Sequence, residues 1–162
     1  MDTLVPLTSN TDNLKLMTAR IAPAPEATSP EVRQRMQVQR RRDTSCEMEI
    51  RSLLHAAGLR YRVDARPLSE WRRRADLVFP RSHTAVFVDG CFWHGCPDHR
   101  TPPKANASWW RAKIARNRER DAETDEHLRA AGWTVIRVWE HEDPAEAAAR
   151  IAEVVTQRRH DG

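Results

Sequence analysis

Two short apolar runs, ADLVF at 75–79 and TAVFVDG at 84–90, lie four residues apart and constrain the fold more than any other feature. Runs of this length and composition favour strands, and a short connection that begins with proline favours an antiparallel hairpin. In that hairpin Phe79 lies opposite Thr84, so Asp76 falls opposite Phe87. Because directly opposed residues share a face, Asp89 lies diagonally on the face of Asp76.

Helical and strand patterns flank this hairpin. The stretch TSCEMEIRSLLHAAG at 44–58 favours a helix that begins at an N-cap and ends at a glycine, and LRYRV at 59–63 favours a strand. A long charged helix is expected from near Ser108 to Gly132, followed by the strand WTVIRVWE and a last helix opened by Asp143 and Pro144. The order predicts an α/β fold, a mixed central sheet flanked by helices.

The chain of 162 residues suits one domain. Residues 1–28 contain prolines and no lasting periodicity, so we expect an N-terminal arm followed by one domain at 29–162. The sequence has no apolar run that could span a bilayer and no signal peptide, which predicts a cytoplasmic protein without membrane contact. Its three cysteines suit a reducing compartment.

The formal net charge of +4 favours a polyanionic partner. Nearly all the basic residues are arginine, whose planar fork suits phosphates and guanine edges, although a coding bias gives the same composition. The cluster Arg40, Arg41 and Arg42 is either a solvated face or a contact to the DNA backbone.

The segment VFVDGCFWHGCPDH at 86–99 contains metal-binding side chains around two aromatic residues. Cys91, Cys96, His99 and the later His141 form a set of thiolate and imidazole ligands that suits tetrahedral zinc. His94 and Asp98 are competing ligands, and isolated buried cysteines with surface histidines are the alternative. Four protein ligands would make such a site structural rather than catalytic. Cys46 lies on the apolar face of its helix and is expected in the core.

The carboxylates have two interpretations each. Asp76 and Asp89, a diagonal step apart, could hold a hard divalent cation, or each could be an ordinary solvated residue near a strand end. Glu47 completes the pattern of a capping box with Thr44, which needs no functional explanation.

Five segments in order, RRDTSCEMEIRSLL, ADLVF, VFVDGCFWHGCPDH, WWRAKIARNRERD and GWTVIRVWEHEDP, resemble the very-short-patch-repair (Vsr) DNA mismatch endonucleases. The resemblance covers about residues 29 to 143. It implies a fold like that of type II restriction endonucleases with a structural zinc site. It also implies a magnesium-dependent cut of one strand, 5′ to the thymine of a T:G mismatch, the product of 5-methylcytosine deamination.

The resemblance also implies roles for individual residues. Asp76 matches a magnesium-binding aspartate, Val88 a position that offers its backbone carbonyl to magnesium, and His94 a catalytic histidine. Glu47 matches a helix glutamate near the scissile phosphate, and Cys91, Cys96, His99 and His141 match the zinc ligands. Phe92, Trp93 and Trp110 match aromatic residues that wedge into DNA. Contacts to DNA are also expected from Lys113, Asn117, Asp121 and Arg40–Arg42.

Some residues depart from the family pattern. Val88 stands where threonine can occur, which removes a hydroxyl, and Asp89 stands where histidine can occur, which adds a carboxylate with a candidate catalytic role. His99 and His141 occupy places where cysteine can appear.

Each of these functional roles has a competing explanation. Trp93 and Trp110 could be core, and adjacent Trp109 and Trp110 cannot both face one side of a helix, so one is expected to be buried and the other exposed. Asn117 and Asp121 could belong to a solvated face.

Competing functions are a restriction-type or homing-like nuclease that cuts paired DNA, and a zinc-stabilised DNA-binding module without catalysis. We expect a monomer that acts on double-stranded DNA, with a mismatch-repair protein as a candidate partner.

Overall fold

The computed structural model describes residues 44–99 and 105–160, together with Pro23, Pro25, Ser29, Pro30 and Gln34. Nearly all of the expected N-terminal arm and the Arg40–Arg42 cluster lie outside the described residues. Within the described part, no helix combines the length and apolarity that a bilayer span requires. The elements are α3 (Ser45–Ala56), β1 (Arg62–Ala65), β2 (Ala75–Phe79), η1 (Pro80–Ser82), β3 (Thr84–Asp89), α4 (Cys91–His94), α5 (Ala107–Ala130), β4 (Thr134–Trp139) and α6 (Pro144–His160).

The four strands form one mixed sheet in the order β1-β2-β3-β4. The hairpin β2–β3 is antiparallel and pairs Phe79 with Thr84, which confirms the register expected from the sequence. Strand β4 pairs with β3 in parallel, from Thr84 opposite Thr134 to Asp89 opposite Trp139. A parallel pair needs a long crossover, and α5 supplies it.

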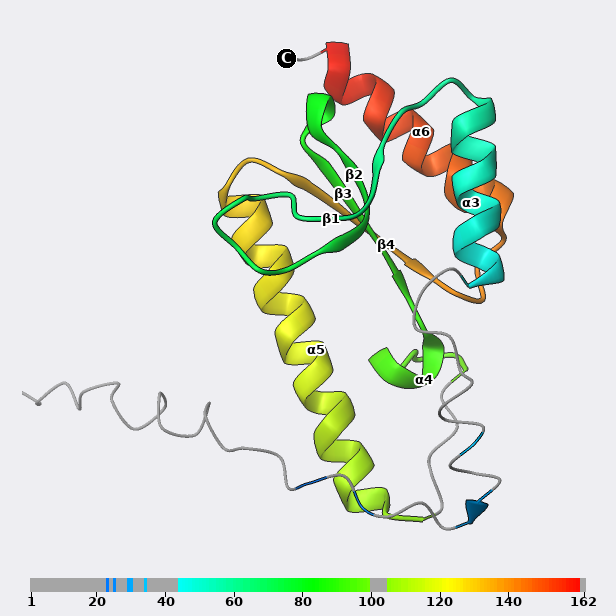
Figure 1. Ribbon diagram of the computed structural model, residues 1–162, viewed down its shortest axis with the longest axis vertical. Coiled ribbons are helices and arrows are strands. Elements are labelled where there is room, and N and C mark those ends of the chain that lie inside the picture. The colour runs from blue at the N-terminus through cyan, green and yellow to red at the C-terminus, as the bar shows by residue number, and fades with distance from the viewer. Residues whose placement is uncertain are drawn as a thin grey trace, which may run out of the picture.

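Helices cover both faces of the sheet (Figure 1). Helices α3 and α6 pack against each other and against one face, where Ile50, Leu77, Val86 and Ile151 belong to the larger core cluster. Helix α5 lies across the other face, where Leu128 and Trp133 pack on Val78 and Ala85. The lower half of α5 runs past the end of the sheet, towards α4.

Most helix boundaries follow the sequence signals. Thr44 is the N-cap of α3, where its Oγ1 accepts a hydrogen bond from the Glu47 amide at 3.3 Å, and Cys46 is buried in the core as expected. The Asp143 carboxylate accepts from the amides of Ala145 and Glu146 at the start of α6. The N-cap of α5 is Asn106, near the expected position at Ser108, whereas no sequence signal predicted the one-turn helix α4.

Gly95 brings α4 against α5. It has a φ of +64°, and a Cβ at this position would lie 2.7 Å from Ile114 Cγ2. Any side chain at this position would therefore push the Cys91–His94 turn away from the long helix. Gly95 is thus the residue that permits the close approach of α4 to α5.

Replacing Gly95 with alanine should destabilise the fold more than replacing Gly58, the matched control. Gly58 has a φ of +79°, and a Cβ added there would have nothing within 4 Å, so Gly58→Ala should cost only the left-handed backbone, about 1–2 kcal/mol. Gly95→Ala should cost about 1–3 kcal/mol more because of the clash with Ile114. Urea unfolding of both variants measures the difference, and equal losses would contradict the close packing of α4 on α5.

Candidate active site at the end of strand β3

The turn that follows β3 is tied to the end of β4. The Cys91 amide donates to Glu140 Oε1 at 2.7 Å, and the Glu140 amide donates to the Asp89 carbonyl at 3.0 Å. The Cys96 amide closes the turn by donating to the Cys91 carbonyl at 2.9 Å. Hydrogen bonds therefore hold the turn of residues 91–96 beside the carboxyl ends of both strands.

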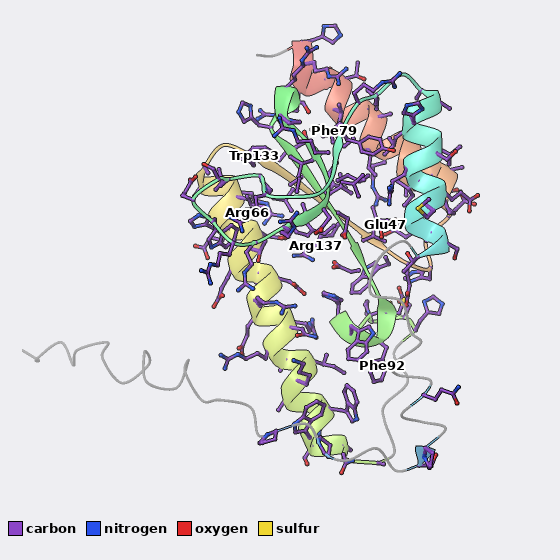
Figure 2. All side chains as sticks on the ribbon, viewed as in Figure 1. Glu47, Arg66, Phe79, Phe92, Trp133 and Arg137 are labelled. Carbon is purple, nitrogen blue, oxygen red and sulfur yellow. The ribbon has the colours of Figure 1, made fainter. Side chains whose placement is uncertain are left out.

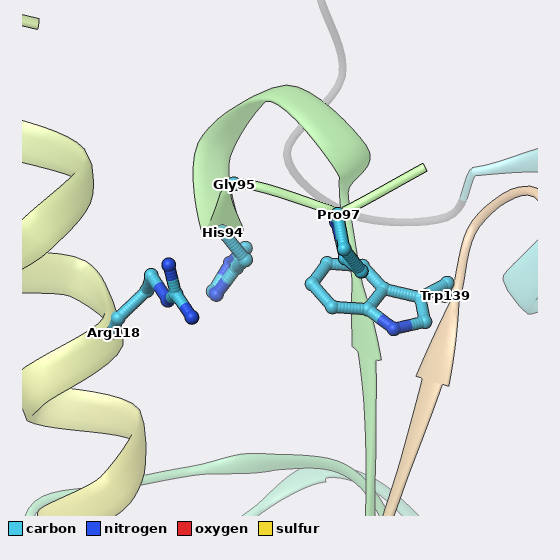
Figure 3. Close-up of a pocket in the computed structure, with 5 residues that line it drawn as sticks. All are labelled: His94, Gly95, Pro97, Arg118 and Trp139. Atoms are coloured by element: carbon cyan, nitrogen blue, oxygen red, sulfur yellow. The ribbon is translucent and has the colours of Figure 1, made fainter. Parts of the chain in front are cut away.

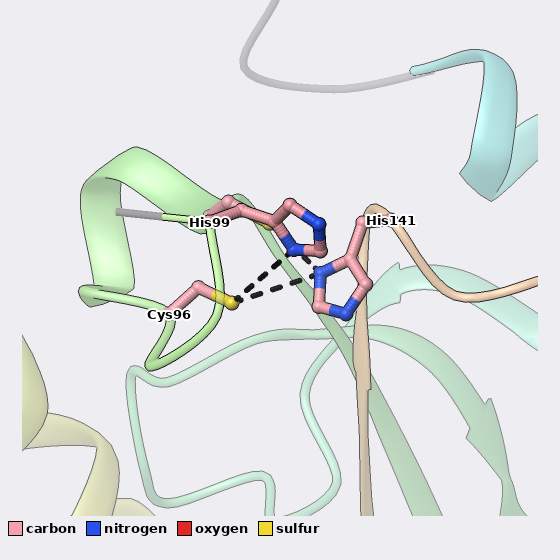
Figure 4. A group of neighbouring side chains, drawn as sticks. Cys96, His99 and His141 are labelled. Carbon is pink, nitrogen blue, oxygen red and sulfur yellow. Dashed lines mark hydrogen bonds between the residues drawn. The ribbon is translucent and has the colours of Figure 1, made fainter. Parts of the chain in front are cut away.

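The four residues expected to bind zinc come together at this turn. The ligand atoms of Cys91, Cys96, His99 and His141 all lie within 4.8 Å of one another. His141 Nδ1 is 3.0 Å from Cys91 Sγ and 3.7 Å from Cys96 Sγ, and Cys96 Sγ is 4.0 Å from His99 Nδ1 (Figure 4). Burial raises the pKa of the Cys91 thiol. Of the two competing ligands, Asp98 is exposed and outside this group, and His94 belongs to a second group with Asp89 and Asp121.

His94 lies between two carboxylates, one from β3 and one from α5. Its Nδ1 is 2.6 Å from Asp121 Oδ2 and 3.5 Å from Asp89 Oδ1. Burial lowers the pKa of His94, but the hydrogen bond to Asp121 and the charge of Asp89 outweigh burial, so the net pKa is raised. Burial raises the pKa of Asp121, and the contact with His94 reverses this to a lowered pKa. These shifts favour an Asp121 carboxylate hydrogen-bonded to His94.

Arg137, on β4 and labelled in Figure 2, supplies the positive charge that contacts these carboxylates. Its Nη1 is 2.9 Å and 2.7 Å from the two Asp89 oxygens, and its Nε is 3.0 Å from Asp125 Oδ1. Arg137 was not among the site residues predicted from the sequence. The available signal was a single charged residue in the otherwise apolar segment TVIRVW.

Asp76 lies at the start of β2, where its Oδ2 accepts a hydrogen bond from the Val88 amide at 2.7 Å. Burial, together with the charges of Glu47 and Asp89, raises its pKa to about 6 against the effect of this hydrogen bond. Glu47 is buried on α3 and also contacts Arg51 at 3.4 Å. Within the described residues, Asp76 belongs to neither three-ligand nor four-ligand cluster, and Asp89 groups with His94 and Asp121.

The aromatic residues form one cluster between α4 and the start of α5. Trp110 is buried, and its ring lies 5.1 Å from that of Phe92 and 5.7 Å from that of Trp93. Phe92, Trp93 and Trp109 are partly exposed. Of the two adjacent tryptophans, Trp110 is therefore the buried one. The Asn117 side chain is buried and donates to the Trp93 carbonyl at 2.8 Å. Asn117 and Asp121 thus both contact the 91–96 turn, while Lys113 is half-buried.

A cavity of about 260 Å³ lies beside His94, between Arg118, Pro97 and Trp139 (Figure 3). Arg118 and Lys113 are five residues apart on α5, so their side chains point about 140° apart around the helix axis. Arg118 therefore lines the cavity from a different side of α5 than Lys113, which is among the expected DNA contacts.

Known proteins of similar sequence are endonucleases and nicking enzymes, and the chain is an endonuclease of this class. The type II nicking enzyme V.NaeI from Lentzea aerocolonigenes is 42% identical over 127 residues, which cover 77% of this chain and 76% of that protein. V.XorIIP, a type II nicking enzyme from Xanthomonas oryzae pv. oryzae, is 41% identical over 117 residues, with coverages of 70% and 83%. The DNA mismatch endonuclease Vsr of Escherichia coli is 37% identical over 101 residues, 61% of this chain and 62% of that protein.

Residues 26–100 also match the sequence model of the family described as DNA mismatch endonuclease Vsr. The chain therefore belongs to the Vsr family, which confirms the resemblance found in the sequence.

Asp76→Asn should stabilise the fold at neutral pH in the absence of added magnesium. The raised pKa means that the folded state binds the proton more tightly than the unfolded state, so stability falls as pH rises from 3.8 to about 6. An amide keeps the acceptor for the Val88 amide and has no charge. The gain above that window should reach at most about 3 kcal/mol, since each pKa unit corresponds to about 1.4 kcal/mol.

Urea unfolding of Asp76→Asn between pH 4 and 8 measures this, with exposed Glu153→Gln as the control. A variant that is less stable than the parent at neutral pH would contradict the assigned cost of the Asp76 charge.

Proposed function

We propose that this protein is a magnesium-dependent endonuclease that nicks one DNA strand 5′ to the thymine of a T:G mismatch. That cut would start very short patch repair of deaminated 5-methylcytosine. Membership of the Vsr family supports the proposal. The observation that carries it is that Asp76 and His94 converge on neighbouring residues of β3, since Asp76 contacts Val88 and His94 contacts Asp89.

The residues around Asp76 fit a magnesium ion. Carboxylate and backbone carbonyl oxygens are the ligands that magnesium uses, and Asp76 with the Val88 carbonyl would supply them. The Asp76 carboxylate is costly to ionise where it lies, with a pKa raised to about 6, and a nearby cation would offset that cost. Bound there, magnesium would polarise the phosphate and offset its developing negative charge.

His94 is the proposed general base. With Nδ1–H donating to Asp121, the ring presents Nε2 as its free acceptor, and Nε2 can take the proton from the attacking water. The raised pKa of His94 increases its basicity. Asp121 therefore sets the orientation of the ring, and Glu47 adds negative charge near Asp76.

Cys91, Cys96, His99 and His141 fit a structural zinc ion. Tetrahedral zinc with bonds of about 2.3 Å to sulfur and about 2.0 Å to nitrogen places its ligand atoms roughly 3.3–3.8 Å apart. The separations of 3.0, 3.7 and 4.0 Å in the structure bracket this range. Four ligands leave no open position for substrate, so the ion would fix the turn that presents His94.

Phe92 and Trp93 are the proposed wedge beside the mismatch. Both rings are partly exposed and rest on buried Trp110, which makes Trp110 their support rather than an inserted group. Unstacking is easier at a mispair than in paired DNA, so a rigid aromatic pair favours mismatched sites. Lys113 and the exposed arginines in the first half of α5 would neutralise backbone phosphates.

Nicking of fully paired DNA is the second candidate. It is favoured by the names of relatives such as the type II nicking enzyme V.NaeI, which state nicking and no mismatch. Both candidates use the same Asp76 and His94 chemistry, so only the substrate separates them.

Duplexes with T:G in varied sequence contexts, each matched by its fully paired counterpart, test the function. With magnesium, the protein should nick the mismatched strand 5′ to thymine and leave the paired duplex intact. Asp76→Asn should bind the T:G duplex and not nick it, whereas Glu153→Gln should nick like the parent. Equal cutting of both duplexes would favour the second candidate, and no magnesium-dependent nicking of either would refute both.

Elemental analysis tests the metal cluster. The purified protein should contain one zinc per chain, and Cys96→Ala should lose the zinc and unfold at lower temperature, because it removes a ligand from the cluster. Cys46→Ala is the matched control: Cys46 is a free buried cysteine on α3, outside the cluster, so this variant should keep its zinc. A zinc-free parent, or a Cys96→Ala variant as stable as the parent, would exclude a structural zinc.

A further inference from the structure

Arg137 contacts three carboxylates and is the only charged residue of β4. Besides its paired contacts to Asp89 and its contact to Asp125, its Nη2 lies 3.3 Å from the Asp121 carbonyl and 3.6 Å from Asp121 Oδ1. The guanidinium also lies 4.7 Å from the ring centre of Phe87, the β3 residue that pairs with Arg137. The side chain is 24% exposed. These contacts hold the guanidinium between β3 and α5.

Two of the carboxylates that Arg137 holds are the two that reach His94. Asp121 and Asp89 lie 2.6 Å and 3.5 Å from His94 Nδ1, one from α5 and one from β3. A single Nδ1–H can donate a strong hydrogen bond to only one of them. Without a cation between them, the two carboxylates would also repel each other, and the ring would have two competing acceptors.

We propose that Arg137 is a positioning residue that selects Asp121 as the partner of His94. By holding both Asp89 oxygens, Arg137 occupies the carboxylate that would compete for Nδ1–H, and it steadies Asp121 through the backbone and side chain. His94 is thereby kept with Nε2 free. Arg137 acts through these groups and does not contact the substrate. The catalytic consequence rests on the proposed function, whereas the effect on the ring does not.

This assignment also gives Asp89 a role. Asp89 occupies a place where the family can have histidine, and both its oxygens are bonded to Arg137. Its charge is therefore matched within the protein. Asp89 and Arg137 act as one unit, so we expect their substitutions to be strongly non-additive.

Arg129 offers a matched control. Its Nη2 contacts Asp125 at 3.1 Å, so it shares one carboxylate with Arg137, but among the described residues it makes no ion pair with Asp89 or Asp121. If Arg137 only stabilises α5, substitutions of Arg137 and Arg129 should have similar effects. If Arg137 positions His94, only its own substitution should change the His94 ring.

The experiment compares Arg137→Gln, Arg137→Lys and Arg129→Gln by two measurements. Nitrogen-15 NMR at a pH where the ring is neutral reports which His94 nitrogen carries the proton, with the signal assigned from His94→Gln. Single-turnover nicking and DNA binding are measured on the same samples. Arg137→Gln should mix the His94 tautomers and slow nicking by about 10–100-fold, the usual loss when a supporting partner is removed, with unchanged affinity for the T:G duplex.

Arg137→Lys should recover part of the rate, because it restores the charge but not the separate contacts that Nε makes with Asp125 and Nη2 makes with Asp121. Arg129→Gln should match the parent in both measurements, and Asp89→Asn with Arg137→Gln should be no slower than Arg137→Gln alone. If Arg137→Gln does not fold, Arg137→Lys carries the test, with an intermediate rate and a measurable tautomer shift.

An unchanged His94 tautomer in both Arg137 variants would overturn the inference, whether or not the parent nicks DNA. A nicking rate equal to that of the parent would overturn its catalytic part and leave the proposed function standing. A parent that nicks no duplex, with a tautomer that still shifts in Arg137→Gln, would refute the proposed function and keep the positioning role.

Discussion

The parallel pairing of β3 with β4 is the constraint on which the site depends. Because Asp89 pairs with Trp139, both strands end at the same level, and the residues that follow them meet there. Cys91 and Cys96 follow β3, and His141 follows β4, so their ligand atoms converge although about fifty positions separate them in sequence. The crossover between the strands is α5, which brings Asn117 and Asp121 to the same end of the sheet. One strand pair thus determines both the cluster and the surroundings of His94.

Among the described residues, the negative charges around His94 are balanced by a positive side chain, whereas the charge of Asp76 is not. Around His94, the carboxylates Asp89, Asp121 and Asp125 all face the cation of Arg137, and paired charges of this kind can be buried at limited cost. Asp76 has a backbone amide and the carboxylates of Glu47, Asp89 and Asp64 around it, and burial together with these charges raises its pKa. The charges around His94, the proposed base, are therefore balanced, whereas Asp76, the proposed metal ligand, has no matching positive charge among the described groups that shift its pKa. This asymmetry is what a site that recruits its own cation requires.

The sequence predicted the parts of the structure that local signals determine. The β2–β3 register, the Thr44 cap and the Asp143 cap each depend on residues within a few positions, and each was found as expected. Ligand chemistry left His94 and Asp98 as competing ligands. The resemblance to the Vsr family gave the set Cys91, Cys96, His99 and His141, and the structure brings these four residues together. The Arg137 contacts were not predictable, because they join β4 to β3 and α5 and depend on which face of the strand is opposite the helix. Helix α4 was missed for a related reason: its turn is held by Glu140 and by the packing of Gly95 on Ile114, both distant in sequence.

The position of the aromatic residues relative to His94 connects the proposed recognition of DNA with its proposed cleavage. Trp93 and His94 are adjacent in one turn, and α5 holds both: Asn117 binds the Trp93 carbonyl and Asp121 binds the His94 ring, four residues later on the same helix. If Phe92 and Trp93 inserted into DNA, any displacement of their turn would also act on α5 through the hydrogen bond from Asn117. The contact between Gly95 and Ile114 permits little sliding between turn and helix. Insertion of the two rings beside a mispair would therefore move His94 toward the DNA backbone as part of the same rigid body. Cutting would then depend on DNA that deforms easily enough to accept the two rings.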